Sequence, residues 1–497
     1  MKNKNVKRFL SSARRLGAGA ALGAAFAGCA VGPDFHPPAP PAGDAYTPTP
    51  LPAQTASAPV AGGAAQRLAM GQDIPAQWWS LFRSEPLDQL LRTALANSPT
   101  MAGAEAALRQ AQENYRAQTG TLAYPAVNAQ LGAARERAAA FGGAPPSVFN
   151  LYNASVNVSY VPDVFGGTRR TLEGARAAVD YQRYQVEATY LALTANVVTT
   201  AIREASLRAQ LQATNEVLDA LRKQLNVLEQ QLQLGAIARA TVLTQRNQVA
   251  QVVATVAPLE KQLAQARHQL SVLAGKLPSE AGMPEFALGS LVLPEQLPVS
   301  LPSALVRQRP DIRASEALLH QASAQVGVAT ANQYPQFTLS AAYGSASPSV
   351  GDLFKSSNAV WNLAAGLTQP IFNGGALSAR RRAAEAAYDQ AAAQYRSTVL
   401  AAFQEVADSL RALDSDAAAL QAQAEAEALA AESLGLATQQ YRLGAISYLV
   451  LLDAQRTYQQ SHINLVQAQA ARYADTAALF QALGGGWWQR AGANNPQ

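Results

Sequence analysis

The chain has 497 residues, of which 49% are hydrophobic and 15% charged, and its formal net charge is +5. Part of this small excess lies in the opening stretch MKNKNVKRFLSSARR, so the remainder is close to neutral and nothing argues for a nucleic-acid partner. The single cysteine, Cys29, excludes an intrachain disulfide and a multi-cysteine metal site, and the four histidines lie far apart in the sequence.

The N-terminus has the pattern of a targeting segment. Its basic stretch is followed by the short apolar run LGAGAALGAAFAGC, which is typical of a secretory signal peptide over residues 1–28. The run ends at Phe26-Ala27-Gly28-Cys29, which resembles a bacterial lipobox, so we expect Cys29 to carry an N-palmitoyl chain and an S-diacylglycerol. The alternative is an ordinary signal peptide with an incidental cysteine. Ala30 follows instead of the aspartate that often retains lipoproteins at the inner membrane, which favours the outer membrane.

Residues 29–85 begin with a stretch rich in proline and alanine, AVGPDFHPPAPPAGDAYTPTPLPAQTASAPVAGGAA. Such a composition cannot bury enough apolar surface to fold alone. We therefore expect this segment to be an extended, lipidated tether.

The rest of the chain repeats one plan. NSPTMAGAEAALRQAQ matches QRPDIRASEALLHQAS, VPDVFGGTRRTLEGARAA matches TQPIFNGGALSARRRAAE, and Gly235 matches Gly444, 209 positions later. We predict a first repeat over residues 86–275, an equatorial linker over 276–307, a second repeat over 308–484 and a C-terminal tail over 485–497.

Each repeat is predicted to contain the same elements in the same order. An amphipathic helix (about 87–119 and 310–332) precedes two strands, and a very long helix follows (175–234 and 376–434, ranges that contain no glycine or proline). A Leu-Gly-Ala-Ile turn then leads into a second long helix. A helix of about 60 residues is about 90 Å long, so it must belong to a coiled coil or an elongated wall.

Heptad spacing supports a coiled-coil hairpin. Leu211, Leu218, Leu225 and Leu232 recur every seven residues before the first turn, and Val242, Val249, Val256 and Leu263 do so after it. Such a seam places the two arms of the hairpin side by side. Pro258 lies within the second arm and should kink or interrupt it.

Four segments alternate apolar and polar residues, as half-buried strands do: PAVNAQLGA, LYNASVNVSY, QFTLSAAYG and VWNLAAGL. A soluble sheet would show the same alternation, but the secretory start favours strands with one face toward lipid and one toward a wet lumen. Four strands cannot close into a barrel, so two or three chains would have to share one.

The two turn regions differ by one carboxylate. RLGAISYLVLLDAQR contains Asp453, whereas the corresponding position of QLGAIARATVLTQRN is Thr244. By spacing alone, Asp453 and Arg456 are an i, i+3 pair on one helix, and a surface ion pair worth a few tenths of a kcal/mol explains them equally well.

Six motifs in order give a resemblance that runs from Cys29 to about Trp488: CAVGPDFHPP, WWSLFRSEPLDQLL, QRPDIRASEALL, QPIFNGG, LLDAQRTYQQ and LGGGW. With them the chain resembles TolC-like outer-membrane efflux proteins, in the lipoprotein branch that includes OprM and the NodT-type factors. The resemblance implies an α+β, mostly α fold with internal duplication. It implies a homotrimer in which four strands per chain form a shared twelve-stranded outer-membrane β-barrel, and antiparallel coiled-coil helices form a periplasmic α-barrel.

The resemblance also assigns roles to the two turns. It implies a periplasmic aperture where three copies of Asp453 form an acidic ring, with Arg456 beside it, Tyr441 and Leu449 as bonding and apolar partners, and Thr244 in the first hairpin. It implies that a periplasmic adaptor docks on the two tips. The tip residues are Gly235, Ala236, Ile237, Gly444, Ala445 and Ile446.

We therefore expect a passive duct that exports small molecules and opens when an adaptor and an inner-membrane RND-type transporter dock. No phosphate-binding loop, nucleophile–base set or metal cluster is visible, so we expect neither an enzyme nor a metal or cofactor beyond the lipid. A type I protein-secretion duct and a non-conducting coiled-coil spacer lipoprotein are the alternatives. The sequence does not identify the exported substrate or the pump.

Overall fold

The computed structural model describes residues 30–490, apart from 42, 44, 140–145 and 281. The predicted signal peptide, Cys29 and most of the predicted tail therefore lie outside the described residues. The described chain divides into two compact units: residues 30–38, 107–183 and 314–396 form the first, and residues 39–106, 184–313 and 397–490 form the second. Each unit thus takes segments from both predicted repeats. In the described part of the chain, no helix combines the length and apolar character needed to cross a membrane.

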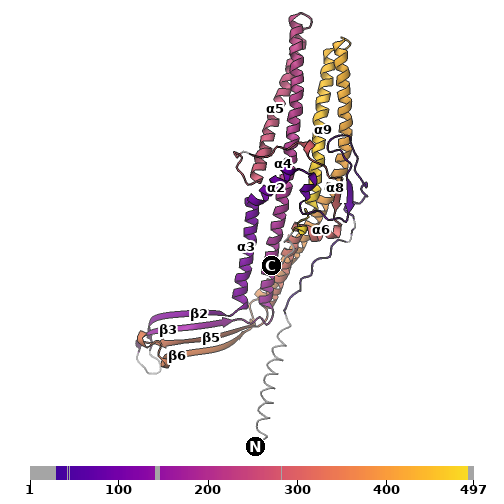
Figure 1. Ribbon diagram of the computed structural model, residues 1–497. Helices are drawn as coiled ribbons and strands as arrows, with labels where there is room; N and C mark the ends of the chain where they lie inside the picture. Colours follow the sequence, from indigo (N-terminus) through magenta and orange to yellow (C-terminus); the bar gives the residue numbers. More distant parts are fainter. Residues whose placement is uncertain (1–29, 42, 44, 140–145, 281, 491–497) are drawn as a thin grey trace. The chain divides into compact units, whose positions relative to one another are not determined.

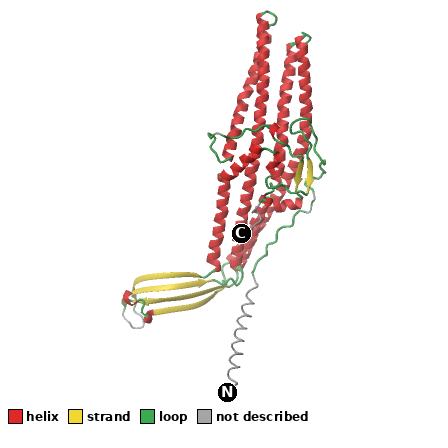
Figure 2. Ribbon diagram, in the orientation of Figure 1, coloured by secondary structure: helices red, strands yellow, loops and turns green. Residues whose placement is uncertain are grey.

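The first unit contains a four-stranded antiparallel sheet, and all four predicted strands are confirmed (Figures 1 and 2). The strands are β2 (Ala126–Ala138), β3 (Ser147–Tyr160), β5 (Gln336–Ser347) and β6 (Ala359–Thr368). They are ordered β2-β3-β5-β6, so the central β3–β5 pairing joins the two repeats.

The register of this sheet sorts its side chains by polarity, because directly opposed residues point to the same face. One apolar row contains Ala129, Val156, Tyr343 and Trp361, and the next contains Val127, Val158, Ala341 and Leu363. The row between them, on the other face, contains Asn128, Asn157, Ala342 and Asn362. In the single chain Trp361 is 77% exposed and Leu363 76%, so the described residues leave these two side chains of the apolar face largely uncovered.

The predicted helix over residues 87–119 is wrong in one respect, because it is two helices. These are α2 (Glu85–Asn97) and α3 (Pro99–Ala123). Ser98 between them is extended, with ψ 118°, since a following proline disfavours the helical conformation. In the second repeat, α7 (Pro310–Ala331) agrees with its predicted range.

Two helical hairpins follow the strands of the two repeats (Figure 1). The first hairpin is α4 (Gly167–Gln233) with α5 (Arg239–Leu273), and the second is α8 (Ala376–Arg442) with α9 (Tyr448–Ala482). The matching lengths, 67 and 35 residues in both hairpins, support the predicted duplication. Pro258 does not interrupt α5. Its neighbours Val252 and Val256 pack against Leu218 and Leu221 of α4, and this seam holds the helix together where the proline removes a backbone donor.

The predicted tether over residues 29–85 is in part folded into the second unit. Strand β1 (Arg67–Met70) pairs in parallel with β4 (Gln296–Val299), and the 3₁₀ helix η1 (Trp78–Phe82) buries its aromatic rings. Trp78 packs 5.5 Å from Phe480 of α9, measured between ring centroids. The predicted linker over 276–307 supplies β4, the short helix α6 (Pro302–Gln308) and the 3₁₀ turn η2 (Leu288–Ser290). The prediction of an unfolded tether rested on the composition of residues 30–65 and should not have been extended to the more apolar residues that follow.

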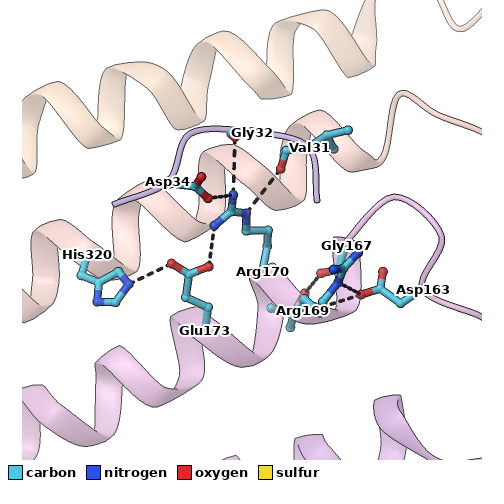
Figure 3. Close-up of polar contacts among 10 residues, drawn as sticks. Val31, Gly32, Asp34, Asp163, Gly167, Arg169, Arg170, Glu173 and His320 are labelled. Carbon is cyan, nitrogen blue, oxygen red and sulfur yellow. Dashed lines mark hydrogen bonds and ion pairs between the residues drawn. The ribbon is translucent and has the colours of Figure 1, made fainter. Parts of the chain in front are cut away.

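Residues 30–36, here called the N-terminal segment, are also held by side chains, within the first unit (Figure 3). The buried Arg170 guanidinium donates to Asp34 Oδ1 at 2.6 Å and to the carbonyl oxygens of Val31 and Gly32 at 3.3 and 3.4 Å. Its third nitrogen donates to Glu173 at 2.8 Å. The guanidinium hydrogen bond and charge hold the pKa of Asp34 below its ordinary value. An extended but docked segment therefore replaces the expected loose tether at this point.

Docking of the N-terminal segment requires glycine at position 32, and a substitution there tests whether the segment is docked. Its φ is +96°, and a Cβ at this position would lie 2.5 Å from the Cα of Gly327. We expect Gly32→Ala to release the segment, so that the Val31 amide, which donates to the Phe165 carbonyl at 3.1 Å, exchanges its hydrogen about tenfold faster. Peptide-resolved hydrogen exchange measures this. Gly71→Ala is the matched control, because Gly71 also has a positive φ, +79°, but has nothing within 4 Å of the added carbon. Equal protection of the segment in Gly32→Ala and wild type would contradict the docking.

Candidate functional site

The two hairpins end in turns of the same geometry, both in the second unit. Gly235 and Gly444 have φ of 72° and 74°, a conformation that glycine adopts without strain. The amide of Ala236 donates to the Gln231 carbonyl and that of Ala445 to the Gln440 carbonyl, both at 2.9 Å. This bond closes the last turn of each long helix in a Schellman motif. The Leu-Gly-Ala-Ile sequence thus specifies a tight helical turn twice.

An apolar cluster packs the second hairpin against the first just behind these turns. We call it the tip cluster. Its buried members are Leu228 of α4, Val242 of α5, and Ala437, Tyr448, Leu451 and Leu452 of the second hairpin. Ile237 and Ile446, the last residues of the two turn motifs, pack against its edge. Burial of these side chains provides a non-directional attraction between the hairpins.

Two hydrogen bonds, here called the polar bridges, connect the same hairpins and fix how one hairpin is aligned with the other. The Tyr448 hydroxyl of α9 donates to Gln245 Oε1 of α5, and Arg456 Nε of α9 donates to Gln248 Oε1 of α5 at 2.7 Å. Gln245 in turn donates to the Leu221 carbonyl of α4 at 2.8 Å. Burial raises the pKa of Tyr448, with a smaller contribution from Tyr441, so its phenol stays protonated and serves as the donor at physiological pH.

The predicted aperture residues occupy different environments. Arg456 forms an inter-hairpin bridge, whereas Asp453, one turn away, is exposed and makes no side-chain bond or ion pair among the described residues. The i, i+3 pair of Asp453 and Arg456 is therefore absent from this part of the chain. Thr244 donates to the Ala240 carbonyl of its own helix at 3.0 Å. Leu449 is 66% exposed.

The predicted role of Tyr441 as a bonding partner at the aperture stays a prediction; within the chain, the tyrosine that bonds the first hairpin is Tyr448. Tyr441 instead packs against the tip cluster, with its ring centroid 5.8 Å from that of Tyr448 in an edge-to-face arrangement. Burial raises the pKa of Tyr441. The difference arises because Tyr448 begins α9 and faces α5, whereas Tyr441 ends α8 and covers the cluster from outside.

Sequence reasoning missed Gln245, Gln248 and Tyr448, although one signal was present. Between Val242 and Val249 the heptad seam requires an apolar residue at position 245, and the sequence has glutamine there. A polar residue in a coiled-coil core position commonly sets the register or the partner at a cost in stability. Gln245 is fully buried, and both ends of its amide are bonded.

The Gln245–Tyr448 bridge predicts a specific pattern of stability. In Gln245→Leu the Tyr448 hydroxyl stays buried without its partner, which should lower the free energy of unfolding by about 2 kcal/mol. Adding Tyr448→Phe removes the unpaired group and should restore most of that loss. Denaturant unfolding of the two single variants and the double variant measures this coupling. Strictly additive losses would show that the two side chains do not interact.

The arrangement is suited to holding two helical hairpins together reversibly. Among the residues that the structure describes, no group of three or more histidine, cysteine or carboxylate side chains could hold a metal ion. Beyond the turns, Leu234 and Leu443 are each 84% exposed, so each tip presents an apolar side chain to its surroundings. The site therefore combines a packed and hydrogen-bonded contact between two hairpins with two exposed turns of the same geometry.

Comparison with known proteins places this geometry in context. Residues 90–276 and 301–485 match the family model described as outer membrane efflux protein. OpmQ of Pseudomonas putida, a pyoverdine export outer membrane protein, is 31% identical over 447 residues, which are 88% of this chain and 94% of OpmQ. TtgC of Pseudomonas putida, a probable efflux pump outer membrane protein, is 30% identical over 475 residues, 95% of each chain. The solved structure of the outer-membrane channel OprN has a TM-score of 0.82 at 25% identity, covering 92% of this chain and all of that chain (100%).

Proposed function

Because this chain belongs to the outer membrane efflux protein family, we propose that it works as a trimeric exit duct whose helical tips close it at rest. It is an outer-membrane efflux channel component, and its family consists of channels rather than enzymes. The order of the assembly, the closure at the tips and the partners are our proposal.

One observation carries the proposal most strongly: the sheet of the first unit has an apolar face with Trp361 and Leu363 largely uncovered by the described residues, and a row with three asparagines on the opposite face. Strands with this alternation suit a wall between lipid and water. In a sheet of four strands, β2 and β6 are edge strands with unpaired backbone groups. Within a lipid bilayer water cannot hydrogen-bond these groups, so each edge needs another strand as its partner. Three copies would supply twelve strands and close a barrel that is wide enough to conduct.

The tips support the closing part of the proposal. With Tyr448 and Arg456 bonded to α5, the second hairpin is held against the first, and exposed Asp453 is left to face other copies of the chain. Three such carboxylates around an axis would form an acidic constriction. Opening then requires the second hairpin to leave the first, and docking of an adaptor on the turns at Gly235 and Gly444 would supply the energy.

We propose small molecules as the cargo and an inner-membrane RND-type transporter as the pump. The relatives support this class, since OpmQ is described as exporting pyoverdine and TtgC as part of an efflux pump. Lipid on Cys29 would add an anchor in the outer membrane. The N-terminal segment that follows it is itself held near the end of β3, because the Val31 amide bonds the Phe165 carbonyl.

The experiment is single-channel recording of the purified protein in a planar lipid bilayer, with oligomeric mass measured on the same sample. A trimer with small, flickering currents is expected. Inserted trimers that never conduct would overturn the duct in favour of a structural spacer. Insertion is checked independently by protection of the sheet from protease.

A further inference from the structure

A small cavity lies between the two hairpins and adjoins the polar bridges, because its lining residue Leu221 accepts the Gln245 hydrogen bond and Gln455 precedes Arg456. Its volume is about 160 Å³, similar to a protein cavity of ~150 Å³ that holds benzene. Its apolar wall consists of Ala213, Val217 and Leu221 of α4 together with Leu434 of α8. Gln455, Tyr458 and His462 of α9 line its other side. All three helix segments belong to the second unit.

The polar side of this cavity contains an acceptor that lacks a donor. Gln455 Oε1 is buried and has no hydrogen-bond partner in the described structure. A buried acceptor left unpaired costs free energy that a donor from a bound molecule would recover. A ligand that suits this cavity therefore needs a hydrogen-bond donor as well as an apolar group.

The charges around the cavity determine which charge a bound donor group should carry. Glu216 lines the mouth, with one carboxylate oxygen accepting from Gln212 at 3.0 Å. The lining residue His462 stacks on Tyr458 with 5.8 Å between ring centroids, and its Nδ1 lies 3.0 Å from Oε1 of Glu427, which supplies a second carboxylate near the cavity. No lysine or arginine is among the described residues that line the cavity. These surroundings favour a cation and disfavour an anion.

We propose that this cavity is a binding site for a small primary ammonium compound with one aromatic ring. The ring fills the space between Val217, Leu221 and Leu434, with Tyr458 beside it. The ammonium lies between the Glu216 carboxylate and Gln455 Oε1 and donates to both. A primary ammonium has three donors, which suits two acceptors and one water molecule.

Binding there affects the hairpins because the walls come from both of them. Separation of the second hairpin from α4 would dismantle the cavity, so a bound amine stabilises the closed arrangement by its differential affinity. This consequence rests on the proposed function, whereas binding itself does not. The site therefore accepts a compound that holds the duct shut.

The test uses 2-phenylethylamine as the probe and the full-length protein in detergent. Isothermal titration should show saturable binding, and phenylacetate, which has the opposite charge, should not bind. Glu216→Gln should weaken the affinity about fivefold, as expected for one partly exposed charge. Ala220→Trp, at the exposed rim, should block entry and abolish binding. Asp219→Asn is the matched control, because Asp219 is an exposed carboxylate of the same helix that does not line the cavity.

Absence of saturable binding to the wild type would overturn the proposal, and so would affinity that is unchanged in both Glu216→Gln and Ala220→Trp. Thermal unfolding of each variant without the probe confirms that it is folded. Bilayer recording separates the two proposals. Amine binding that lowers the open probability supports both the cavity site and the duct. Amine binding to a protein that never conducts supports the cavity site and overturns the duct. Conduction by a protein that does not bind the amine supports the duct and overturns the cavity site.

Discussion

Replacing Tyr448 by phenylalanine and Arg456 by alanine in one chain is expected to convert small, flickering currents into large, steady ones. Each substitution removes one bridge from α9 to α5, and each bridge is worth roughly 1 kcal/mol. Loss of about 2 kcal/mol shifts the balance between closed and open hairpins about 30-fold in each subunit. Single-channel recording in a planar bilayer measures the open probability directly.

The control for this variant removes an ion pair that stays within one hairpin. Arg246 of α5 bonds Glu229 of α4 at 2.7 Å, so Arg246→Ala changes charge and packing near the tip without releasing the second hairpin. We expect its currents to match those of the wild type. Large currents in both variants would mean that any damage near the tip opens the duct. Small currents in both variants would show that the bridges do not keep the duct closed. The exposed Asp453 would then be the remaining candidate for closure, and Asp453→Ala would test it.

Replacing Arg309 by alanine is expected to lower the free energy of unfolding by about 3 kcal/mol. The Arg309 side chain is 9% exposed and joins three elements of the second unit. It donates to the Ala482 carbonyl at the end of α9 at 2.9 Å, to Asp311 at the start of α7 and to Glu405 of α8. Its loss leaves two carboxylates and a helix-terminal carbonyl without their shared donor. Denaturant unfolding measures the change.

Arg307→Ala is the control for this prediction, because Arg307 lies two residues earlier in α6 and is exposed. It should change stability by less than about 0.5 kcal/mol. Arg309→Lys should recover little, since an ammonium cannot reproduce the planar set of donors. A loss in Arg309→Ala no larger than in Arg307→Ala would show that the three elements are held together without this residue.

The periodic elements of this fold could be predicted from the sequence because each depends on a local pattern. Period-two alternation located all four strands of the large sheet, and the duplicated turn glycines located both hairpin ends. Where two local signals compete, prediction failed: the apolar pattern continues across residues 97–99, but Pro99 ends α2. The proline- and alanine-rich composition of the N-terminal part likewise concealed Trp78 and Phe82, whose burial depends on α9, some four hundred residues away in the chain.

The candidate site was predictable only in part, for a similar reason. The turn geometry is encoded within six residues, and it was predicted correctly. The partners of α9 lie on α5, about two hundred residues earlier, so spacing on one helix suggested Asp453 for Arg456 where the structure has Gln248. Gln245 was detectable as a polar interruption of a heptad seam, but its acceptance of a bond from Tyr448 follows only from the packing of the two hairpins.

The pairing of β3 with β5 has a consequence for the origin of the chain. This ladder, from Tyr152 opposite Ser347 to Tyr160 opposite Leu339, joins one repeat to the other. In an ancestor that consisted of a single repeat, a second polypeptide would have had to pair with the same edge, so twice as many subunits would have been needed for the same number of strands. In the duplicated chain the neighbouring strands are joined covalently, so the two halves no longer need to be identical. Mutations could then accumulate in one half alone, which accounts for an aspartate at position 453 and a threonine at position 244.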